Sequence, residues 1–160
     1  MKLTEGKKAP AIKLKDQDGK SINLSDFSGQ KVVIYFYPKD DTPTCTVQAC
    51  NLRDNFSVLQ KNGIVVIGIS PDEEESHKKF AGKHKLPFIL LADPKHTVLE
   101  KYGVWGEKSM YGRKYMGVIR TTFLIDEKGV LRKIIEKPKS SEHAKEIMNE
   151  WKKIAVAEKK

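Results

Sequence analysis

Three short, continuous apolar runs constrain the fold of this chain most strongly. They read KVVIYFY at residues 31–37, GIVVIGIS at 63–70 and FILLAD at 88–93. Runs of this length, rich in β-branched and aromatic residues, are typical of strands that are buried on both faces. Because segments of helical character separate them, the pattern indicates an α/β protein whose central sheet carries helices on both faces.

Further elements are predicted around these runs. Residues 11–24 alternate apolar and polar side chains about Asp18 and Gly19, which indicates an N-terminal β-hairpin. We expect the other elements at 44–61 (helix), about 70–85 (helix), 96–103 (short helix), 121–136 (two strands around a turn at 126–129) and 141–157 (closing helix). No repeat or linker interrupts them, so we expect residues 1–160 to form a single domain.

Two helices can be predicted in more detail. Ser70, Pro71 and Glu73 have the residue types of an N-cap, a first helical position and an N3 position, so we expect a capping box that starts at Ser70. The inward stripe of the first helix is expected to consist of Val47, Phe56, Val58 and Leu59.

The segment that follows the short helix is interpreted as loop. Trp105 is expected to be a loop anchor or a partial cover of the site and not a catalytic group. Arg113 and Lys114 are expected to lie in a solvated loop.

The balance of charge and the apolar runs exclude several classes of function. Thirty Lys and Arg against 21 Asp and Glu give a net charge of +9, but the lysines are scattered, so we expect a solvated basic surface and no specific nucleic-acid partner. The apolar run at 32–37 is too short to cross a bilayer, so no membrane association is expected. Residues 1–10 lack the apolar stretch of a signal peptide, which predicts a cytoplasmic protein.

Both cysteines of the chain, Cys45 and Cys50, lie in the segment YFYPKDDTPTCTVQAC at residues 35–50. Core packing is one interpretation, since free cysteine is often buried, although Cys45 lies near a predicted loop–helix junction. Zinc binding is another, but zinc sites combine CxxC-like spacing with further Cys or His ligands, and the four histidines form no such pattern. We favour a redox pair, and we expect no metal, no cofactor and no catalytic histidine.

Helix geometry makes the redox interpretation specific. Five residues along an α-helix correspond to a rise of about 7.5 Å and a rotation of about 140°, which separates the two Cα atoms by roughly 8–9 Å. A disulfide tolerates at most about 7 Å between Cα atoms. A bond between Cys45 and Cys50 therefore requires the first turns of the helix to unwind.

Cys45 is expected to be the more reactive of the two thiols. A sulfur at the start of a helix faces unpaired N–H groups and the positive end of the helix dipole, both of which favour the thiolate. Cys50 lies more than a turn further along and gains little of this effect. We therefore assign Cys45 as the nucleophile and Cys50 as the resolving thiol.

The segment PKDDTPTC resembles the P-x-x-x-T-x-x-C signature of the peroxiredoxins, through Pro38, Thr42 and Cys45. CTVQAC, with a second cysteine five residues on, is similar to the bacterioferritin-comigratory or peroxiredoxin Q subgroup. The resemblance extends over nearly the whole chain, through LSDFSGQKVVIYFYPKDDTPTC, GVWGEKSMYG and IRTTFLID. Two positions depart from the usual pattern. Thr44 stands where many members have a glycine before the cysteine, and Ile12 ends an N-terminal segment where the motif P-x-F is common.

The resemblance implies a thioredoxin-like fold, with a central mixed β-sheet flanked by helices, and a thiol peroxidase activity. The expected substrates are hydrogen peroxide and organic hydroperoxides. Cys45 would form a sulfenic acid, Cys50 would convert it to an intramolecular disulfide, and a thioredoxin-like dithiol would reduce that disulfide. Since the resolving thiol belongs to the same chain, we expect a monomer.

Three further residues are candidates for the site. Thr42 offers a hydroxyl that can hold the peroxide, and Pro38, rigid and without an N–H, can shield the thiolate from water. Arg120 resembles the family's active-site arginine, whose permanent charge would favour the thiolate and stabilise the transition state. Without the signature, Pro38 reads as a strand end, Thr42 as a turn residue and Arg120 as one basic residue among thirty.

Two other functions remain as alternatives. A thioredoxin-type disulfide exchanger would normally carry CxxC, and the spacing of Cys45 and Cys50 counts against it. A basic nucleic-acid-binding or chaperone-like protein with incidental cysteines would react with peroxide only as slowly as free cysteine does.

Overall fold

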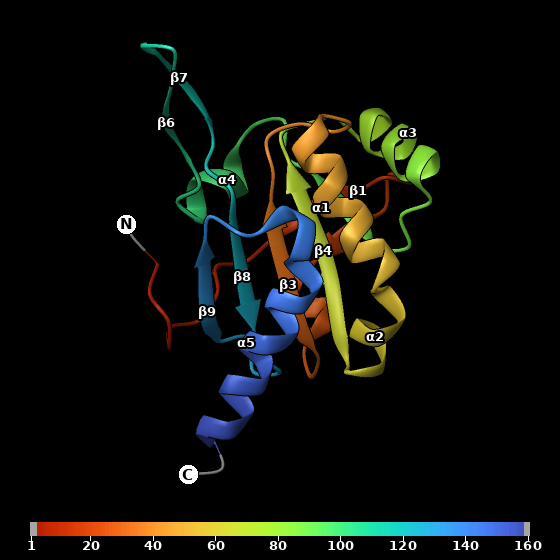
Figure 1. Ribbon diagram of the computed structural model, residues 1–160, viewed down its shortest axis with the longest axis vertical. Helices are drawn as coiled ribbons and strands as arrows, with labels where there is room; N and C mark the ends of the chain where they lie inside the picture. The colour runs from red at the N-terminus through yellow and green to blue at the C-terminus, as the bar shows by residue number, and fades with distance from the viewer. Residues whose placement is uncertain (1–2, 159–160) are drawn as a thin grey trace.

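The computed structural model describes residues 3–158, and a seven-stranded mixed sheet forms its centre (Figure 1). The strands lie in the order β2-β1-β5-β4-β3-β8-β9. Their bounds are β1 Lys13–Asp16, β2 Ser21–Asn23, β3 Lys31–Phe36, β4 Ile64–Ser70, β5 Ile89–Ala92, β8 Thr121–Ile125 and β9 Leu131–Glu136. A separate two-stranded sheet consists of β6 (Trp105–Met110) and β7 (Arg113–Val118).

The three apolar runs occupy the middle of the sheet, as predicted. Strands β3, β4 and β5 are parallel neighbours, while β8 is antiparallel to β3 and β1 is antiparallel to β5. The carboxyl ends of β3 and β4 therefore meet at one edge of the sheet, which is the edge where sites in α/β proteins usually form.

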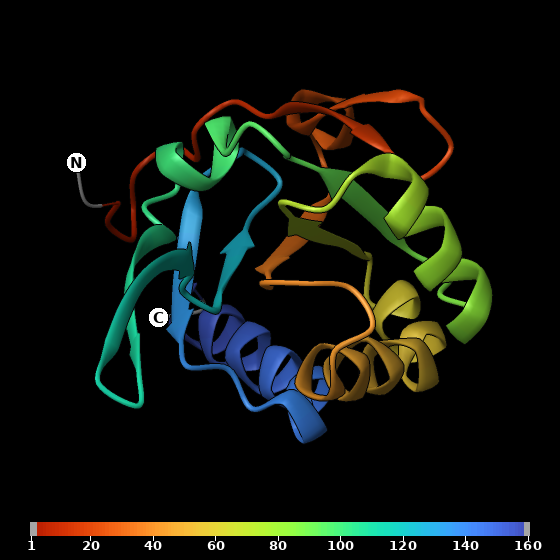
Figure 2. The same ribbon diagram turned by 90° about the horizontal axis from the view of Figure 1, so that it is seen from above.

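Helices cover both faces of the sheet. Their bounds are α1 Pro43–Asp54, α2 Phe56–Lys61, α3 Glu74–His84, α4 Thr97–Lys101 and α5 His143–Glu158, with short 3-10 helices at Leu24–Phe27 and Ser140–Glu142. Helices α1, α2 and α5 lie over one face and α4 lies over the other (Figures 1 and 2). None of the described helices is both long enough and apolar enough to cross a membrane.

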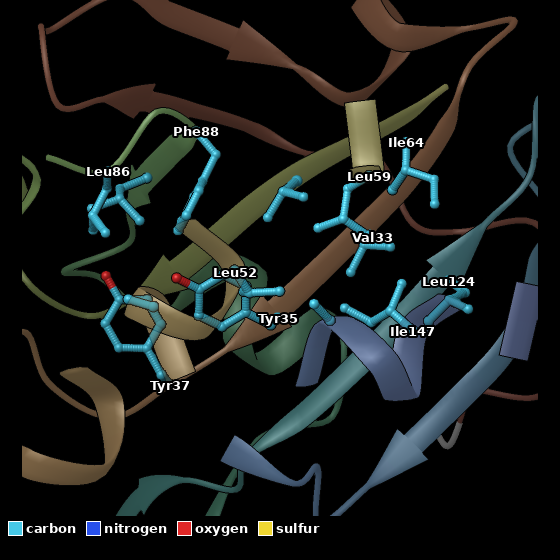
Figure 3. Close-up of a cluster of buried hydrophobic side chains, with 14 of the residues drawn as sticks. Val33, Tyr35, Tyr37, Leu52, Leu59, Ile64, Leu86, Phe88, Leu124 and Ile147 are labelled. Carbon is cyan, nitrogen blue, oxygen red and sulfur yellow. The ribbon is translucent and has the colours of Figure 1, made fainter. Parts of the chain in front are cut away.

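Alternate side chains of β3 enter two separate cores. Val33 and Tyr35, followed by Tyr37 just beyond the strand, point to the side of α1 and α5, where Leu52 and Ile147 meet them (Figure 3). Val32, Ile34 and Phe36 point to the opposite side of the sheet. There they form a second core with Val98 and Leu99 of α4. The period of two is that of a strand, and burial on both faces explains why the sequence shows no polar alternation.

The predicted N-terminal hairpin is confirmed as β1 and β2, which pair antiparallel. Asp16 Oδ1 accepts the N–H groups of Asp18 and Lys20 at 2.9 and 3.0 Å, which closes the turn. Gly19 has φ of +79°, a conformation that glycine adopts without strain.

The helix predicted at 44–61 is two helices. Asn55 separates α1 from α2 with φ −111° and ψ 12°, and its side-chain amide donates to Asn51 O at 2.8 Å. The predicted inward stripe is wrong for Val47 and Val58, whose side chains are 47% and 48% exposed, and Leu59 supplies the buried contact. Phe56 is partly buried and packs against the same core as Leu59, so the predicted stripe is confirmed only for these two residues.

The capping box expected at Ser70 is wrong. Ser70 is the last residue of β4 and is buried, and its hydroxyl donates to Asp72 Oδ2 at 2.7 Å. Helix α3 begins at Glu74, with Glu73 as an extended N-cap that makes no side-chain cap. The side chain of Ser70 is therefore committed to the loop after β4 and not to a helix start.

Residues 105–118, expected as loop, form the β6–β7 hairpin, which projects from the body of the molecule (Figure 1). Trp105 lies in β6 and stacks on His96 with ring centroids 3.8 Å apart. Arg113 and Lys114 are exposed, as expected, but they belong to β7.

Candidate active site

The loop that leaves β3 is tied to the loop that leaves β4. The N–H of Asp40 donates to Asp72 Oδ2 at 2.8 Å, and the Ser70 hydroxyl donates to the same oxygen at 2.7 Å. These two bonds position residues 38–42 at the carboxyl edge of the sheet, directly before α1.

A buried hydrogen-bond network centred on Asp40 supports this loop. Asp40 Oδ1 accepts the Tyr37 hydroxyl at 2.6 Å, and Oδ2 accepts the Ser76 hydroxyl at 2.7 Å. His77 Nδ1 lies 2.7 Å from Asp40 Oδ2, while His77 Nε2 lies 2.9 Å from Leu91 O, an oxygen that can only accept. Burial, more than any other cause, raises the pKa of the Tyr37 phenol well above its ordinary value, so the hydroxyl remains a donor.

The same network contains a cluster of metal-ligand types. Ligand atoms of Asp40, Asp72 and His77 lie within 4.8 Å of one another. Each of these side chains already has hydrogen-bond partners within the protein, including both nitrogens of His77. A bound cation would have to displace these bonds, so the arrangement fits a structural support for the loop and not a metal centre.

Cys45 lies in the first turn of α1. Thr42 is the N-cap residue, with φ −85° and ψ 156°, and Pro43 follows it as the first helical residue. Thr42 makes no side-chain cap; its hydroxyl donates instead to Lys39 O at 2.9 Å. An α-helix leaves its first N–H groups without intrahelical acceptors, and the N–H groups of Thr44 and Cys45 are in this first turn. The Cys45 side chain is only 1% exposed.

Arg120 brings a permanent positive charge to this sulfur. Its Nη2 donates to Cys45 Sγ at 2.8 Å, and its Nη1 donates to Gln48 Oε1 at 3.3 Å. Arg120 lies between β7 and β8, so the contact joins residues 75 positions apart in the chain. A guanidinium at this distance places a permanent positive charge and a hydrogen-bond donor directly against the sulfur.

Gln48 is a site residue that the sequence analysis missed. It lies three residues after Cys45 on α1, on the same side of the helix, and it is fully buried. Its Oε1 holds Arg120, while its Nε2 has no hydrogen-bond partner among the described residues. The i+3 spacing from Cys45 was the available signal, but spacing alone does not distinguish Gln48 from an ordinary core-facing residue.

Lys108 of β6 also lies close to the site. Burial lowers the pKa of its amine, the charge of Arg120 lowers it further, and Cys45 opposes the shift. Its Nζ donates to Val118 O at 2.9 Å, across the hairpin. The base of the β6–β7 hairpin thus adds a second cation near Arg120, which the sequence analysis did not identify.

Cys50 lies on α1 but faces a different part of the molecule. Its sulfur is 3.9 Å from His84 Nδ1, at the end of α3, whereas the Cys45 sulfur contacts Arg120. Both cysteines are free thiols, and Cys50 is less buried than Cys45. The structure is that of the reduced protein with an intact helix between the two sulfurs.

The structure therefore brings together two of the five expected site residues by direct contact, Cys45 and Arg120. Thr42 lies at the start of the same helix, and Pro38 is half-buried in the loop that leads to it. Cys50 is on the same helix but turned away.

Residues 5–134 match the model of the AhpC/TSA family. The chain belongs to this family. Its relatives at about half identity are peroxiredoxins, and the chain is likewise a thiol-dependent peroxidase of the Bcp or PrxQ group. Peroxiredoxin Bcp of Escherichia coli K12 is 50% identical over 151 residues, covering 94% of this chain and 96% of that protein. Peroxiredoxin Bcp of Bacillus subtilis 168 is 45% identical over 152 residues, covering 95% and 97%.

Solved structures of the same group confirm the thioredoxin-like fold. A cysteine-to-serine mutant of Xylella fastidiosa PrxQ superimposes with a TM-score of 0.90 at 28% identity, covering 97% of this chain and 99% of that one. The bacterioferritin comigratory protein of Xanthomonas campestris, studied for alkyl peroxide reduction, superimposes with a TM-score of 0.84 at 31% identity, covering 90% and 92%. The expected mixed sheet flanked by helices is thus confirmed.

Proposed function

We propose that Cys45 is the peroxidatic nucleophile and Cys50 the resolving thiol, in the reduction of hydrogen peroxide and organic hydroperoxides. The observation that carries this assignment is the 2.8 Å contact between Arg120 and the Cys45 sulfur at the start of α1. Of the two sulfurs, only that of Cys45 lies beside a guanidinium and in the first helical turn, where N–H groups have no intrahelical acceptors.

In the first step, the Cys45 thiolate attacks one oxygen of the peroxide. An S–O bond forms, the O–O bond breaks, and the departing oxygen takes up a proton to leave as water or an alcohol. Negative charge moves from the sulfur to the departing oxygen during this attack, and Arg120 with the N–H groups of the first turn stabilises it.

Thr42 and Pro38 shape the approach of the peroxide. The Thr42 hydroxyl has its proton committed to Lys39 O, so its oxygen is free to accept a hydrogen bond from the peroxide O–H. Pro38 adds a rigid wall without an N–H group, at the point where the strand gives way to the loop. The alkyl peroxide activity of the Xanthomonas relative supports organic hydroperoxides as substrates.

In the second step, Cys50 attacks the sulfenic acid on Cys45, and an intramolecular disulfide forms with loss of water. A thioredoxin-like dithiol then reduces this disulfide. Because the whole cycle uses thiols of one chain, we propose that residues 1–160 work as one monomeric domain. Since the cycle needs a dithiol reductant, a reducing compartment, the cytoplasm, is the proposed location.

A count of thiols after one turnover tests this function. Reduced protein is mixed with one equivalent of hydrogen peroxide, and the remaining thiols are titrated. We expect the wild type to lose both thiols rapidly within one chain. Cys50→Ser should consume one peroxide and stop at a sulfenic acid or a mixed disulfide, and Cys45→Ser should react as slowly as free cysteine. Equal reactivity of the two serine variants would overturn the assignment.

A further inference from the structure

His84 stands between Cys50 and a carboxylate. Its Nδ1 is 3.9 Å from Cys50 Sγ, a distance that an S–H···N hydrogen bond can span, and its Nε2 is 3.0 Å from Asp41 Oδ1. The three side chains come from α1, from the end of α3 and from the loop before α1. They form a thiol–imidazole–carboxylate series around the second cysteine, separate from the contact of Arg120 with the first.

The carboxylate determines which nitrogen of His84 is free. An ionised carboxylate only accepts hydrogen bonds, so the Nε2 that faces Asp41 carries the proton in the neutral ring. The Nδ1 that faces Cys50 then presents its lone pair to the thiol. This is the orientation that a base needs to take a proton from sulfur, with the partner on the other nitrogen holding the ring.

We propose that His84 is the general base for Cys50 in the resolving step, and that Asp41 is a positioning residue that orients the imidazole. The proposal rests on the assignment of Cys50 as the resolving thiol. In the step, the proton of Cys50 passes to His84 Nδ1, and the Cys50 sulfur attacks the Cys45 sulfur. The S–S bond forms, the S–O bond of the sulfenic acid breaks, and the departing hydroxide is protonated to water. Cys50 is oxidised and Cys45 is reduced, so no other reactant is needed.

The charges around His84 suit this role. Lys83 Nζ donates to the other oxygen of Asp41 at 2.7 Å, and Arg53 Nη1 of α1 donates to the backbone oxygen of His84 at 2.8 Å. The hydrogen bond from Lys83, first, and that from His84, second, lower the pKa of the Asp41 carboxyl, which stays ionised. His84 is also the last residue of α3, where the helix dipole favours a positive ring after proton transfer. The edge of the ring packs on Phe80 at 5.2 Å between centroids.

The placement of His84 and Asp41 is compatible with unwinding of the first turn of α1. His84 belongs to α3, so it does not move with the first turn of α1 when that turn unwinds. Asp41 is tied to α3 through both Lys83 and His84. The base and its positioning residue are therefore held by a separate element while Cys45 moves toward Cys50.

Single-turnover kinetics of His84→Phe test the proposal, because phenylalanine keeps the ring shape and the packing on Phe80 but has no nitrogen. Peroxide consumption and disulfide formation are followed separately, with dimedone trapping of the sulfenic acid. We expect peroxide consumption as fast as in the wild type and disulfide formation slower by about tenfold or more. His96→Asn, which removes an imidazole from the stack on Trp105, is the control and should change neither step.

Chemical rescue with imidazole distinguishes a general base from a residue that contributes only packing. In His84→Ala, added imidazole should restore part of the lost rate of disulfide formation, and Asp41→Asn should slow the same step while peroxide consumption stays normal. Unchanged disulfide formation in His84→Phe, or a slow His84→Ala that imidazole does not accelerate, would overturn the proposal. If His84→Phe loses both steps through misfolding, Asp41→Asn decides: a normal resolving rate there counts against the base. A wild type that forms no sulfenic acid would instead overturn the proposed function.

Discussion

Cys45 and Cys50 share helix α1, yet their sulfurs face different partners, Arg120 for the first and His84 for the second. The helix is continuous from Pro43 to Asp54, so the pair has the separation of an intact helix, roughly 8–9 Å between Cα atoms. This exceeds the limit of about 7 Å for a disulfide. The reduced structure therefore holds the Cys45 sulfur beside Arg120 while it keeps Cys50 too far away for a disulfide.

Replacement of Arg120 should slow the attack on peroxide. Arg120→Met removes the charge beside the Cys45 sulfur, so we expect the rate constant of sulfenic acid formation to fall by about 100-fold. Arg120→Lys should give an intermediate rate. Lysine keeps the charge, but it lacks the planar guanidinium that donates to Cys45 and Gln48 at the same time. Stopped-flow measurement with hydrogen peroxide gives these rates. The control is Arg113→Met, at an exposed position of β7, and an equal loss there would show a general effect of net charge.

Neutralising Asp40 should destabilise the fold near the site. Asp40→Asn leaves His77 buried without its carboxylate, so we expect the free energy of unfolding to fall by about 3 kcal/mol. Urea titration of the reduced protein measures the change. Asp18→Asn, an exposed position in the turn between β1 and β2, is the matched control. Equal stabilities of the two variants would show that the pair of Asp40 and His77 does not support the loop.

A methyl group at Gly68 should disturb the packing of the buried Tyr35 ring. A Cβ there would lie 2.8 Å from Cζ and 2.9 Å from the hydroxyl of Tyr35, which is buried against β4. We expect Gly68→Ala to lower the free energy of unfolding by about 1–3 kcal/mol, since the ring has little room to move. Gly82→Ala, within α3 and with open space around the new methyl, should instead stabilise the protein by about 0.5–1 kcal/mol. A neutral Gly68→Ala would contradict the close contact with Tyr35.

The hydrogen bond between His143 and Glu146 at the start of α5 predicts a pH dependence of stability. The hydrogen bond from His143 is the largest of the causes that lower the pKa of Glu146 from its ordinary value of 4.5. Because the folded pKa is the lower one, the unfolded state binds more protons in this range. The stabilisation is thus fully present above pH 4.5 and is lost as the pH falls through the folded value.

Glu146→Gln should therefore be less stable than the wild type by about 1 kcal/mol at neutral pH, and the difference should vanish in acid. Urea titrations across the acidic range measure it. The control is Glu142→Gln, which removes the same charge at an exposed position nearby. A difference that stays constant with pH would contradict the bond between Glu146 and His143.

Much of the fold could be predicted from the sequence because its central strands are buried on both faces. An unbroken apolar run such as 31–37 indicates a central strand whatever surrounds it. The β6–β7 hairpin could not be predicted in this way. Its strands carry Lys108, Arg113 and Lys114, and they pair with each other away from the main sheet, so burial imposes no pattern on them.

The site could be predicted only in part, for a similar reason. Cys45, Cys50 and Thr42 lie close together in the chain, and the start of a helix has known chemistry. The partners of the two sulfurs come from other elements, 75 residues away for Arg120 and 34 for His84. Only the family resemblance identified Arg120. No resemblance identified His84, and no catalytic histidine was expected from the sequence, because the proposed role of His84 depends on how α3 packs beside α1.

Hydrogen exchange of the α1 amides, compared between the reduced protein and the protein oxidised by one equivalent of peroxide, tests the central claim most directly. Mass spectrometry of the same samples confirms the bond between Cys45 and Cys50. We expect the amides of residues 46–50, which are hydrogen-bonded within α1, to be protected in the reduced protein and to lose that protection in the oxidised one, while β3 and β4 stay protected. An intramolecular disulfide that forms with the protection of α1 unchanged would contradict the account.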